Sequence, residues 1–467
     1  MGNDQEPTMR CCQDIVMFPW FAMGHITPFL HLANKLAEKG CRIKMLLPNK
    51  AIQVIHHLNL HPHLITFHTI AVPQVEGLPL GTETASDIPI SLAHLLAIAF
   101  DRTRDQFQAT ILHSKPDLVI YDLAHWVPAL VKPLGIKSMS YTVVSAAGIA
   151  ILLVPARNIT KDKPITVAEL SVPPPGYPSS TVVLRGHEVQ SLLFVAQPFG
   201  DNGVTFYEKV TTSMHQCDAL AIRTCSEIEA NLCDYIGSQY GKPVFLTGPV
   251  LPELSTNMPL EDRWATWLGG FEPGSVVFCA FGSQLVLDKD QFQKLVLGFE
   301  LSGLPFLVAL KPPTGSSTVE EALPAGFCER VKGRGMVWGG WVQQLVILSH
   351  PSVGCFVSHC GFGSMWEALM CDCQIVLMPH LGDQILNTRL LADELKVAVE
   401  VERDENGWTS KESISKSIKL VMDKDSEVAS TIKTNHTRYR QTLTTQGLMS
   451  RYIDKFFQNI QDLVRQK

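Results

Sequence analysis

The feature that most constrains the fold of this chain is an alternation of short apolar runs with segments whose apolar residues recur at helical spacing. Residues 14–19 form the first run, and residues 42–47 form the second. Between them lies a helical pattern closed by Gly40, for which we expect Thr27 as the N-cap and Pro28 at the first helical position. A strand, a helix and a strand in this order predict two parallel strands joined by a covering helix.

The same alternation runs through both halves of the chain, and only the polar, irregular stretch at 248–262 interrupts it. The further apolar runs that we expect to be buried strands are 118–121, 139–145, 219–224, 276–280, 306–310, 355–358 and 375–378. This pattern predicts an α/β fold with two doubly wound, Rossmann-like domains that face each other across a cleft. We place these domains at 1–250 and 263–447, joined by a linker at 251–262. We expect a C-terminal helix at 448–467 to pack back on the first domain.

Composition excludes several classes of partner. The chain has 467 residues and a net charge of −6, which is a poor match for nucleic acid or an anionic membrane. Its longest weakly polar stretch, at 143–155, is shorter than the about 20 residues that cross a bilayer, and its acidic start is unlike a secretory signal. Its twelve cysteines show neither zinc-site spacing nor a disulfide framework. We therefore expect a cytoplasmic protein with reduced thiols, no metal, no nucleic-acid partner and no stable membrane insertion.

Most of the candidate chemistry lies in a 44-residue stretch from Trp341 to Gln384, which we call the box. Within it a strand ends at Ser358, a turn with glycines follows, and a helix is expected to begin near Ser364. Backbone N–H groups at a helix start, approached through glycines, form a site suited to phosphate. The turn alone is weak evidence, because it lacks the Walker and dinucleotide patterns and because Ser364 and Glu367 have the spacing of a capping box.

As a whole, the box closely resembles the signature of plant secondary-product UDP-glycosyltransferases. Its opening Trp341, its internal histidine, serine and glutamate, and its closing Asp383-Gln384 pair stand at that family's spacing. The resemblance extends across most of the chain, including Phe281-Gly282-Ser283 and Gly24-His25. It implies the GT-B fold of two Rossmann-like domains and an inverting sugar transfer from a UDP-sugar, without a metal or another cofactor.

The resemblance also assigns donor contacts residue by residue. Trp341 would stack on uracil, and the backbone of Val342 would pair with the uracil edge. Gln344 and Glu367 would hold the ribose hydroxyls, which suits a carboxylate that can accept two hydrogen bonds. The residues expected around the diphosphate, together with the helix start, are Ser283, His359, Gly361, Gly363 and Ser364.

The transferred sugar would be bound by Asp383 and Gln384, which would hydrogen-bond its hydroxyls. The box departs from the family pattern at Phe362 and Gly363, where most members have Trp and Asn. Because Gly363 has no side chain to contact phosphate, backbone groups must contribute more at this position.

The candidate catalytic pair lies outside the box. His25 follows the first strand, in the expected turn before a helix, and Asp122 ends the run 116–121. A lone histidine at such a place is more often structural, but the resemblance implies that His25 is the general base and Asp122 its partner. An aspartate that accepts the imidazole N–H fixes the tautomer and leaves the other nitrogen free to take a proton. The competing Asp117 precedes the strand and is expected at the far end of the sheet.

Within the family, residues 359–367 and 386–390 resemble the branch that adds a sugar to a sugar of flavonoid or anthocyanin glycosides. We therefore expect transfer from a UDP-sugar to a sugar hydroxyl of a phenolic glycoside. We expect the protein to be a monomer that binds these two small molecules. Glucosyl-, xylosyl- and rhamnosyltransferases have very similar boxes, so Gln384 does not identify the donor sugar.

Other functions remain open from the sequence. These are transfer directly to an aglycone, a nicotinamide-dependent enzyme, and a sugar-nucleotide-binding protein without turnover. Asp288-Lys289-Asp290 and Asp423-Lys424-Asp425 have the spacing of metal-dependent glycosyltransferases, but both lie in polar segments beside helices, where carboxylates favour a helix start or solvent. The chain has no G-x-S-x-G motif, which disfavours a serine hydrolase.

Overall fold

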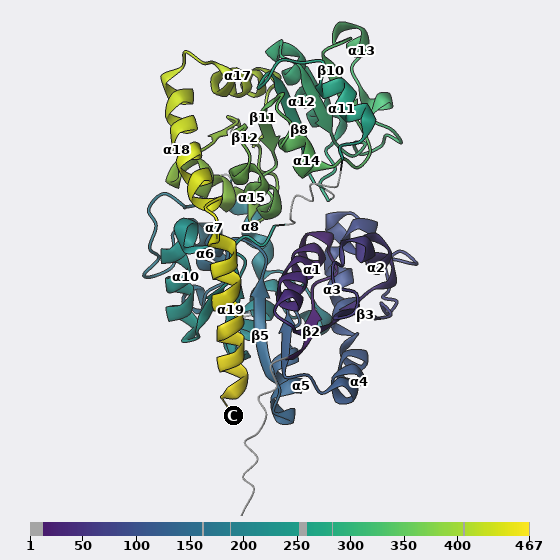
Figure 1. The fold of residues 1–467 in the computed structure, drawn as a ribbon, viewed down its shortest axis with the longest axis vertical. Coiled ribbons are helices and arrows are strands. Elements are labelled where there is room, and N and C mark those ends of the chain that lie inside the picture. The colour runs from purple at the N-terminus through teal and green to yellow at the C-terminus, as the bar shows by residue number, and fades with distance from the viewer. Residues whose placement is uncertain are drawn as a thin grey trace, which may run out of the picture.

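Two parallel β-sheets, one in each half of the chain, form the framework of the structure (Figure 1). The structure is a computed structural model that describes residues 13–160, 163–186, 188–251, 259–282, 284–404 and 407–466. We call residues up to 251 the N-terminal half and residues 259–447 the C-terminal half. Ser283 and residues 252–258 of the expected linker lie outside the described residues.

Within the described residues, the first sheet has seven strands in the order β3-β2-β1-β4-β5-β6-β7. They are β1 (Asp14–Phe18), β2 (Arg42–Leu47), β3 (Ile65–Thr69), β4 (Leu118–Tyr121), β5 (Lys137–Thr142), β6 (Ala219–Ile222) and β7 (Val244–Leu246). The second sheet has six strands in the order β10-β9-β8-β11-β12-β13 over the same described ranges. They are β8 (Val276–Ala280), β9 (Phe306–Ala309), β10 (Gly335–Trp338), β11 (Val353–Ser358), β12 (Gln374–Leu377) and β13 (Val399–Glu400).

Helices connect the strands and cover both sheets. Those of the N-terminal half are α1 (Met23–Glu38), α2 (Asn49–Ile55), α3 (Ala93–Asp101), α4 (Arg104–Ser114), α5 (Val127–Val131), α6 (Ala146–Leu152), α7 (Val167–Ser171), α8 (Glu188–Leu192), α9 (Phe206–Gln216) and α10 (Ser226–Tyr240). Those that follow are α11 (Asp262–Leu268), α12 (Lys289–Ser302), α13 (Phe327–Arg330), α14 (Gln344–Leu348), α15 (Phe362–Met370), α16 (Gln384–Arg389), α17 (Lys411–Met422), α18 (Glu427–Leu443) and α19 (Leu448–Arg465). None of the helices in the described ranges combines the length and the apolar character that a membrane span requires.

The prediction of two doubly wound, parallel-sheet halves is confirmed, and every strand expected from an apolar run is present. The strands that were not expected are β3, β7, β10 and β13, and all of them lie at sheet edges. An edge strand is not covered on both faces, so its sequence does not need a continuous apolar run.

The predicted start of the first helix is wrong. Helix α1 begins at Met23 rather than at Pro28, and its N-cap is Ala22, which provides no side-chain hydrogen bond. Pro28 therefore lies inside the helix, although a proline there removes one backbone hydrogen bond. The side chain of Ile26, in the extra turn, is fully buried, so core packing favours the longer helix. As a result, His25 lies in the first turn of α1 and not in a turn before it.

The C-terminal helix α19 packs against the N-terminal half, alongside α1 and β7 (yellow in Figure 1). The helix is amphipathic, and its buried apolar face comprises Ile453, Phe456, Ile460 and Leu463, which join the core around β1 and β2. Tyr452 adds a polar contact, because its hydroxyl donates to Glu227 Oε2 at 2.7 Å. The domain bounds at 1–250, 251–262, 263–447 and 448–467 stay predictions.

A buried arginine joins the two halves. Arg389, at the end of α16, is 1% exposed and forms ion pairs with Glu188 of α8 at 2.5 Å and with Glu400 of β13 at 2.7 Å. Arg185 lies at the surface beside this pair and forms ion pairs with Asp393 at 2.7 Å and with Glu400 at 3.3 Å. The Arg389–Glu188 pair therefore crosses between the halves where water is excluded.

We expect Arg389→Met to lower the free energy of unfolding by about 3–5 kcal/mol, because it leaves the Glu188 carboxylate buried without its cation. Arg185→Met is the matched control, since its side chain is 52% exposed and pairs with Asp393 and Glu400, which Arg389 also contacts, but not with Glu188. It should cost less than about 1 kcal/mol. Urea unfolding of both variants provides the measurement, and equal effects would contradict the assignment of Arg389 as the interdomain anchor.

Candidate functional site

The structure brings His25 and Asp122 together at the carboxyl ends of neighbouring strands. β1 and β4 pair with Phe18 opposite Tyr121, so the residues that follow these strands emerge side by side. Nδ1 of His25 is hydrogen-bonded to Oδ2 of Asp122. Oδ1 of Asp122 accepts the backbone N–H of Leu123 at 2.9 Å, which fixes the carboxylate.

This arrangement leaves His25 open on its other side. Its side chain is 23% exposed, whereas that of Asp122 is 9% exposed. Asp117 lies at the amino end of β4, where its carboxylate accepts the backbone N–H of Asp14 at 2.9 Å. Asp117 therefore occupies the far end of the sheet, as predicted, and is not available to His25.

The box forms the carboxyl end of the second sheet and the helix that follows it. β11 ends at Ser358, and α15 begins at Phe362, two residues before the predicted start. Its N-cap is Gly361, which supplies no side-chain hydrogen bond, so first-turn N–H groups stay available to a ligand. Ser364 lies inside the helix, and its hydroxyl accepts from Gln344. The capping-box interpretation of Ser364 and Glu367 is therefore wrong.

Glycines make room for the imidazole of His359 in this turn. A Cβ on Gly361 would lie 2.5 Å from Nε2 of His359, and one on Gly282 would lie 3.1 Å from it. Gly282 also has a φ of 70°, which side chains rarely adopt. Burial lowers the pKa of His359 from 6.5 to about 4. At neutral pH His359 is thus an uncharged hydrogen-bonding group.

Three residues predicted to contact the donor form one hydrogen-bonded cluster. Nε2 of Gln344 donates to Oγ of Ser364 at 3.0 Å and to Oε2 of Glu367 at 2.5 Å. Burial raises the pKa of the Glu367 carboxyl, and the hydrogen bond from Gln344 and the positive charge of Arg223 partly offset this effect. Beside the cluster, Trp341 is 74% exposed and Val342 is buried. An exposed indole next to buried polar groups is suited to stacking on a flat ring.

Asp383 and Gln384 begin α16 at the boundary between the halves. A Cβ on Gly148 of α6 would lie 3.5 Å from the Cβ of Asp383. Oε1 of Gln384 accepts backbone N–H groups of His380 and Leu381 at 2.9 and 3.0 Å, which holds the loop before α16. Burial raises the pKa of Asp383, whereas a hydrogen bond from Asn387 and the nearby His25 lower it. The candidate base His25 thus lies near enough to Asp383 to favour the ionised form of its carboxyl.

One charged residue of this region was not predicted. Arg223 follows β6 in the N-terminal half, and its Nη1 lies 3.9 Å from the position of a Cβ on Gly363. The available signal was an arginine within the apolar run 219–224. Only the packing of the halves shows that this side chain reaches α15.

The carboxylates with D-x-D spacing have local roles. Asp288 caps α12 by accepting the N–H of Gln291 at 2.8 Å, and Asp290 pairs with Lys294 at 2.7 Å. Over the part of the chain that the structure describes, no group of three or more His, Cys, Asp or Glu side chains is arranged to hold a metal.

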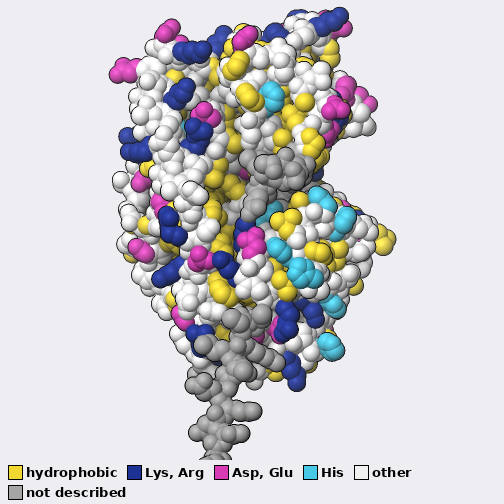
Figure 2. Space-filling model, in the orientation of Figure 1, with side chains coloured by type: hydrophobic (Ala, Val, Ile, Leu, Met, Phe, Trp, Pro, Cys, Tyr) yellow, Lys and Arg dark blue, Asp and Glu magenta, His cyan; other side chains and the backbone are white. Residues whose placement is uncertain are grey.

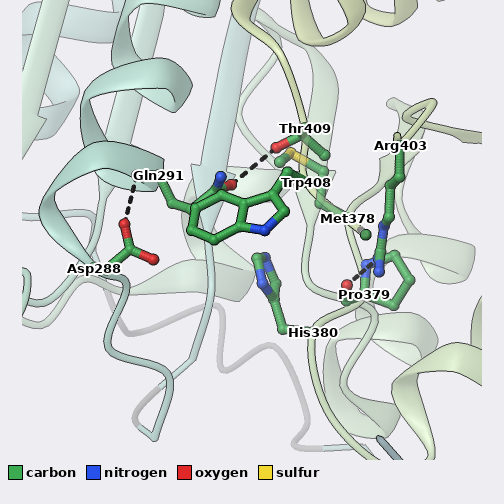
Figure 3. Close-up of a pocket in the computed structure, with 9 residues that line it drawn as sticks. Asp288, Gln291, Met378, Pro379, His380, Arg403, Trp408 and Thr409 are labelled. Atoms are coloured by element: carbon green, nitrogen blue, oxygen red, sulfur yellow. Dashed lines mark hydrogen bonds between the residues drawn. The ribbon is translucent and has the colours of Figure 1, made fainter. Parts of the chain in front are cut away.

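A cavity of about 230 Å³ is lined in part by residues 378–380 of the box (Figure 3). Its lining residues are Asp288, Gln291, Met378, Pro379, His380, Arg403, Gly407, Trp408 and Thr409. No residue predicted to contact the donor or to act in catalysis lines it. We expect the donor instead at the boundary between the halves; on the face drawn in Figure 2, the outline of the molecule is indented between the two halves on the right.

The lowered pKa of His359 predicts a pH effect on stability. Between pH 6.5 and about 4 the unfolded chain binds a proton at this histidine and the folded chain does not. The free energy of unfolding therefore falls as the pH drops through this window, by at most about 1.4 kcal/mol per pH unit. His359→Gln should show a shallower decline in urea unfolding between pH 7.5 and 5, whereas the exposed His63→Gln should decline like the parent. Identical slopes for the parent and His359→Gln would contradict this prediction.

Comparisons with known proteins agree with the resemblance of the box. A family model described as UDP-glucoronosyl and UDP-glucosyl transferase matches residues 332–437. UDP-glycosyltransferase 79B6 of Arabidopsis thaliana is 57% identical over 449 residues, which cover 96% of this chain and 97% of that protein. Anthocyanidin 3-O-glucoside 2'''-O-xylosyltransferase of the same plant is 57% identical over 468 residues, which cover 99% of each.

Solved structures share the fold over nearly the whole chain. UGT89C1 of Arabidopsis thaliana, complexed with UDP-L-rhamnose, has a TM-score of 0.75 at 20% identity and covers 96% of this chain and 99% of its own. UGT71G1 of Medicago truncatula, complexed with UDP-glucose, has a TM-score of 0.77 at 21% identity, with coverage of 97% and 98%. At these identities the similarity concerns the fold, and it confirms the GT-B arrangement.

Proposed function

The chain belongs to the UDP-glycosyltransferases, and we propose that it transfers a sugar from a UDP-sugar to a hydroxyl of the sugar on a phenolic glycoside. The observation that carries the catalytic part is the hydrogen-bonded His25–Asp122 pair, whose imidazole lies near enough to Asp383 of the opposite half to lower the pKa of that carboxyl. The acceptor class is supported by the relative named as an anthocyanidin 3-O-glucoside xylosyltransferase.

The mechanism is a single displacement at the anomeric carbon. His25 takes the proton of the acceptor hydroxyl, and the hydroxyl oxygen attacks the anomeric carbon while UDP leaves from the opposite face. Asp122 accepts a hydrogen bond from Nδ1–H of His25, which fixes the tautomer and stabilises the imidazolium that forms when Nε2 takes the acceptor proton. The configuration at the anomeric carbon is therefore inverted.

The donor would lie along the carboxyl edge of the second sheet. Uracil would stack on Trp341, the ribose hydroxyls would meet Gln344 and Glu367, and the diphosphate would approach the start of α15. Negative charge builds on the diphosphate as the bond to the sugar breaks, so the N–H dipoles of α15 stabilise the transition state. At the start of α16, Asp383 and Gln384 would hold the sugar between the diphosphate and His25. The proposed donor contacts also include Ser283, His359, Gly361, Gly363, Ser364 and the backbone of Val342.

We further propose that the reaction needs no metal, that the enzyme works as a monomer and that it is cytoplasmic. The donor site described above already supplies helix dipoles and hydrogen-bond donors to the leaving group, which is the task that a metal performs in other glycosyltransferases.

Removing the base tests the catalytic assignment. His25→Ala should lower turnover by about 10²–10⁴-fold, because no group remains to take the proton, while UDP affinity should stay within about twofold. Asp122→Ala should lower turnover less strongly. Asp117→Asn is the matched control, since this aspartate lies at the other end of the sheet, and it should leave turnover unchanged. UDP release and calorimetric titration of UDP provide the readouts, and near-normal turnover of His25→Ala would overturn the mechanism.

The acceptor assignment predicts a strong preference for glycosides. A cleft built to hydrogen-bond the sugar of the acceptor leaves polar groups unpaired when that sugar is missing. A phenolic monoglycoside should therefore exceed its own aglycone by well over tenfold in kcat/KM, with a sugar–sugar bond in the product. NMR of the product, after turnover in EDTA with UDP-glucose, UDP-xylose and UDP-rhamnose in parallel, provides the test. Equal use of the aglycone would remove the glycoside assignment, and inhibition by EDTA would remove metal independence.

A further inference from the structure

Arg223 is a buried cation at the boundary between the two halves. It follows β6 directly and is 3% exposed. Its Nε donates to the carbonyl oxygen of Pro249 at 2.6 Å, and its Nη2 donates to that of Val250 at 3.4 Å. These bonds hold one edge of the guanidinium against residues 249–250, which follow the last strand of the first sheet, β7. Within the described residues, Nη1 forms no hydrogen bond.

The free edge of this guanidinium faces the start of α15. Nη1 lies 3.9 Å from the position that a Cβ on Gly363 would occupy. Because residue 363 is a glycine, no side chain fills the space in front of Nη1. Gly363 lies in the first turn of α15, where backbone N–H groups lack partners within the helix. A helix start carries partial positive charge, and a guanidinium beside it is unfavourable unless an anion lies between them.

Arg223 is buried and has no ion-pair partner among the described residues, although desolvation of an unpaired charge is costly. Burial lowers the pKa of Arg223, whereas Tyr141 and then Glu367, one turn beyond Gly363 on the same face of α15, raise it. Glu367 is itself held by Nε2 of Gln344 at 2.5 Å. Within the described residues, no anion therefore contacts the cation directly, and the space over Gly363 is open to one.

We infer that Arg223 binds the diphosphate of the UDP-sugar, so that the N-terminal half contributes a charged donor contact as well as the base. This inference rests on the proposed function. His359 is uncharged at neutral pH, so it offers the diphosphate a hydrogen bond but no charge. Arg223 supplies that charge and, since charge builds on the diphosphate as the sugar leaves, stabilises the departing group.

Comparing UDP with uridine separates this role from a structural one. Calorimetric titration of Arg223→Met should show UDP affinity lowered at least tenfold and uridine affinity changed less than twofold. Arg223→Lys keeps the charge but loses the planar fork, so its UDP affinity should fall less. Glu367→Ala removes a ribose contact and should weaken both ligands alike. Arg403→Met is the control, because Arg403 is a half-buried arginine that also donates to a proline carbonyl oxygen, but it lines the separate cavity of Figure 3.

The outcomes distinguish the inference from the proposed function. Unchanged UDP affinity in Arg223→Met, or parallel losses of UDP and uridine, would overturn the inference and leave the UDP-sugar site standing. A parent enzyme that binds UDP no more tightly than uridine would instead remove the diphosphate site and the proposed function. Melting curves show whether Arg223→Met is folded. If it is not, Arg223→Lys decides alone, and equal effects on UDP and uridine in that variant would overturn the inference.

Discussion

The buried ion pair between Arg389 and Glu188 is the interaction on which the arrangement of the site depends. The candidate base lies in the N-terminal half and the proposed donor contacts lie in the C-terminal half, so neither half has a complete site. Arg389 ends α16, and the same short helix begins with Gln384, directly after Asp383. Six residues span only about 9 Å, so an anchor at one end of the helix positions Asp383 and Gln384, the proposed sugar contacts, at the other. The anchor thereby sets how the sugar contacts face His25.

The charges around the donor site form a consistent pattern. Burial keeps His359 neutral, and residues 341–384 include no lysine or arginine, so the box itself provides little positive charge. Burial also raises the pKa values of Glu367 and Asp383, which favours their neutral forms. In the proposed complex the diphosphate is stabilised by the start of α15 and by Arg223 from the other half. A donor bound in this way would stabilise the packing of the two halves, because a ligand favours the arrangement in which it makes contacts with both. The proposal thus links donor binding to the arrangement of the halves.

The sequence predicts the centre of each sheet better than its edges. Interior strands such as β4 and β8 are buried on both faces and read as continuous apolar runs, so their bounds could be predicted. Strands β3, β7, β10 and β13 lie at edges, where partial exposure allows polar residues and removes that signal. The start of α1 was misjudged because Pro28 is favourable at a first helical position, whereas burial of Ile26 decided in favour of a longer helix. Core packing therefore outweighs the local preference of proline for a helix start where a longer helix buries another apolar side chain.

The same distinction applies to the site. The box is contiguous in sequence, so its cluster of Gln344, Ser364 and Glu367 could be anticipated from spacing and resemblance. Arg223 could not, because it lies 140 residues before Gly363 and meets it only when the halves pack together. Its sequence signal, one charge within an apolar run, is indistinguishable from a strand end that reaches solvent. What makes it informative is the combination of burial, two backbone acceptors and the absence of an ion pair among the described residues. A charge that the protein buries without a partner indicates that a ligand of opposite charge completes the structure.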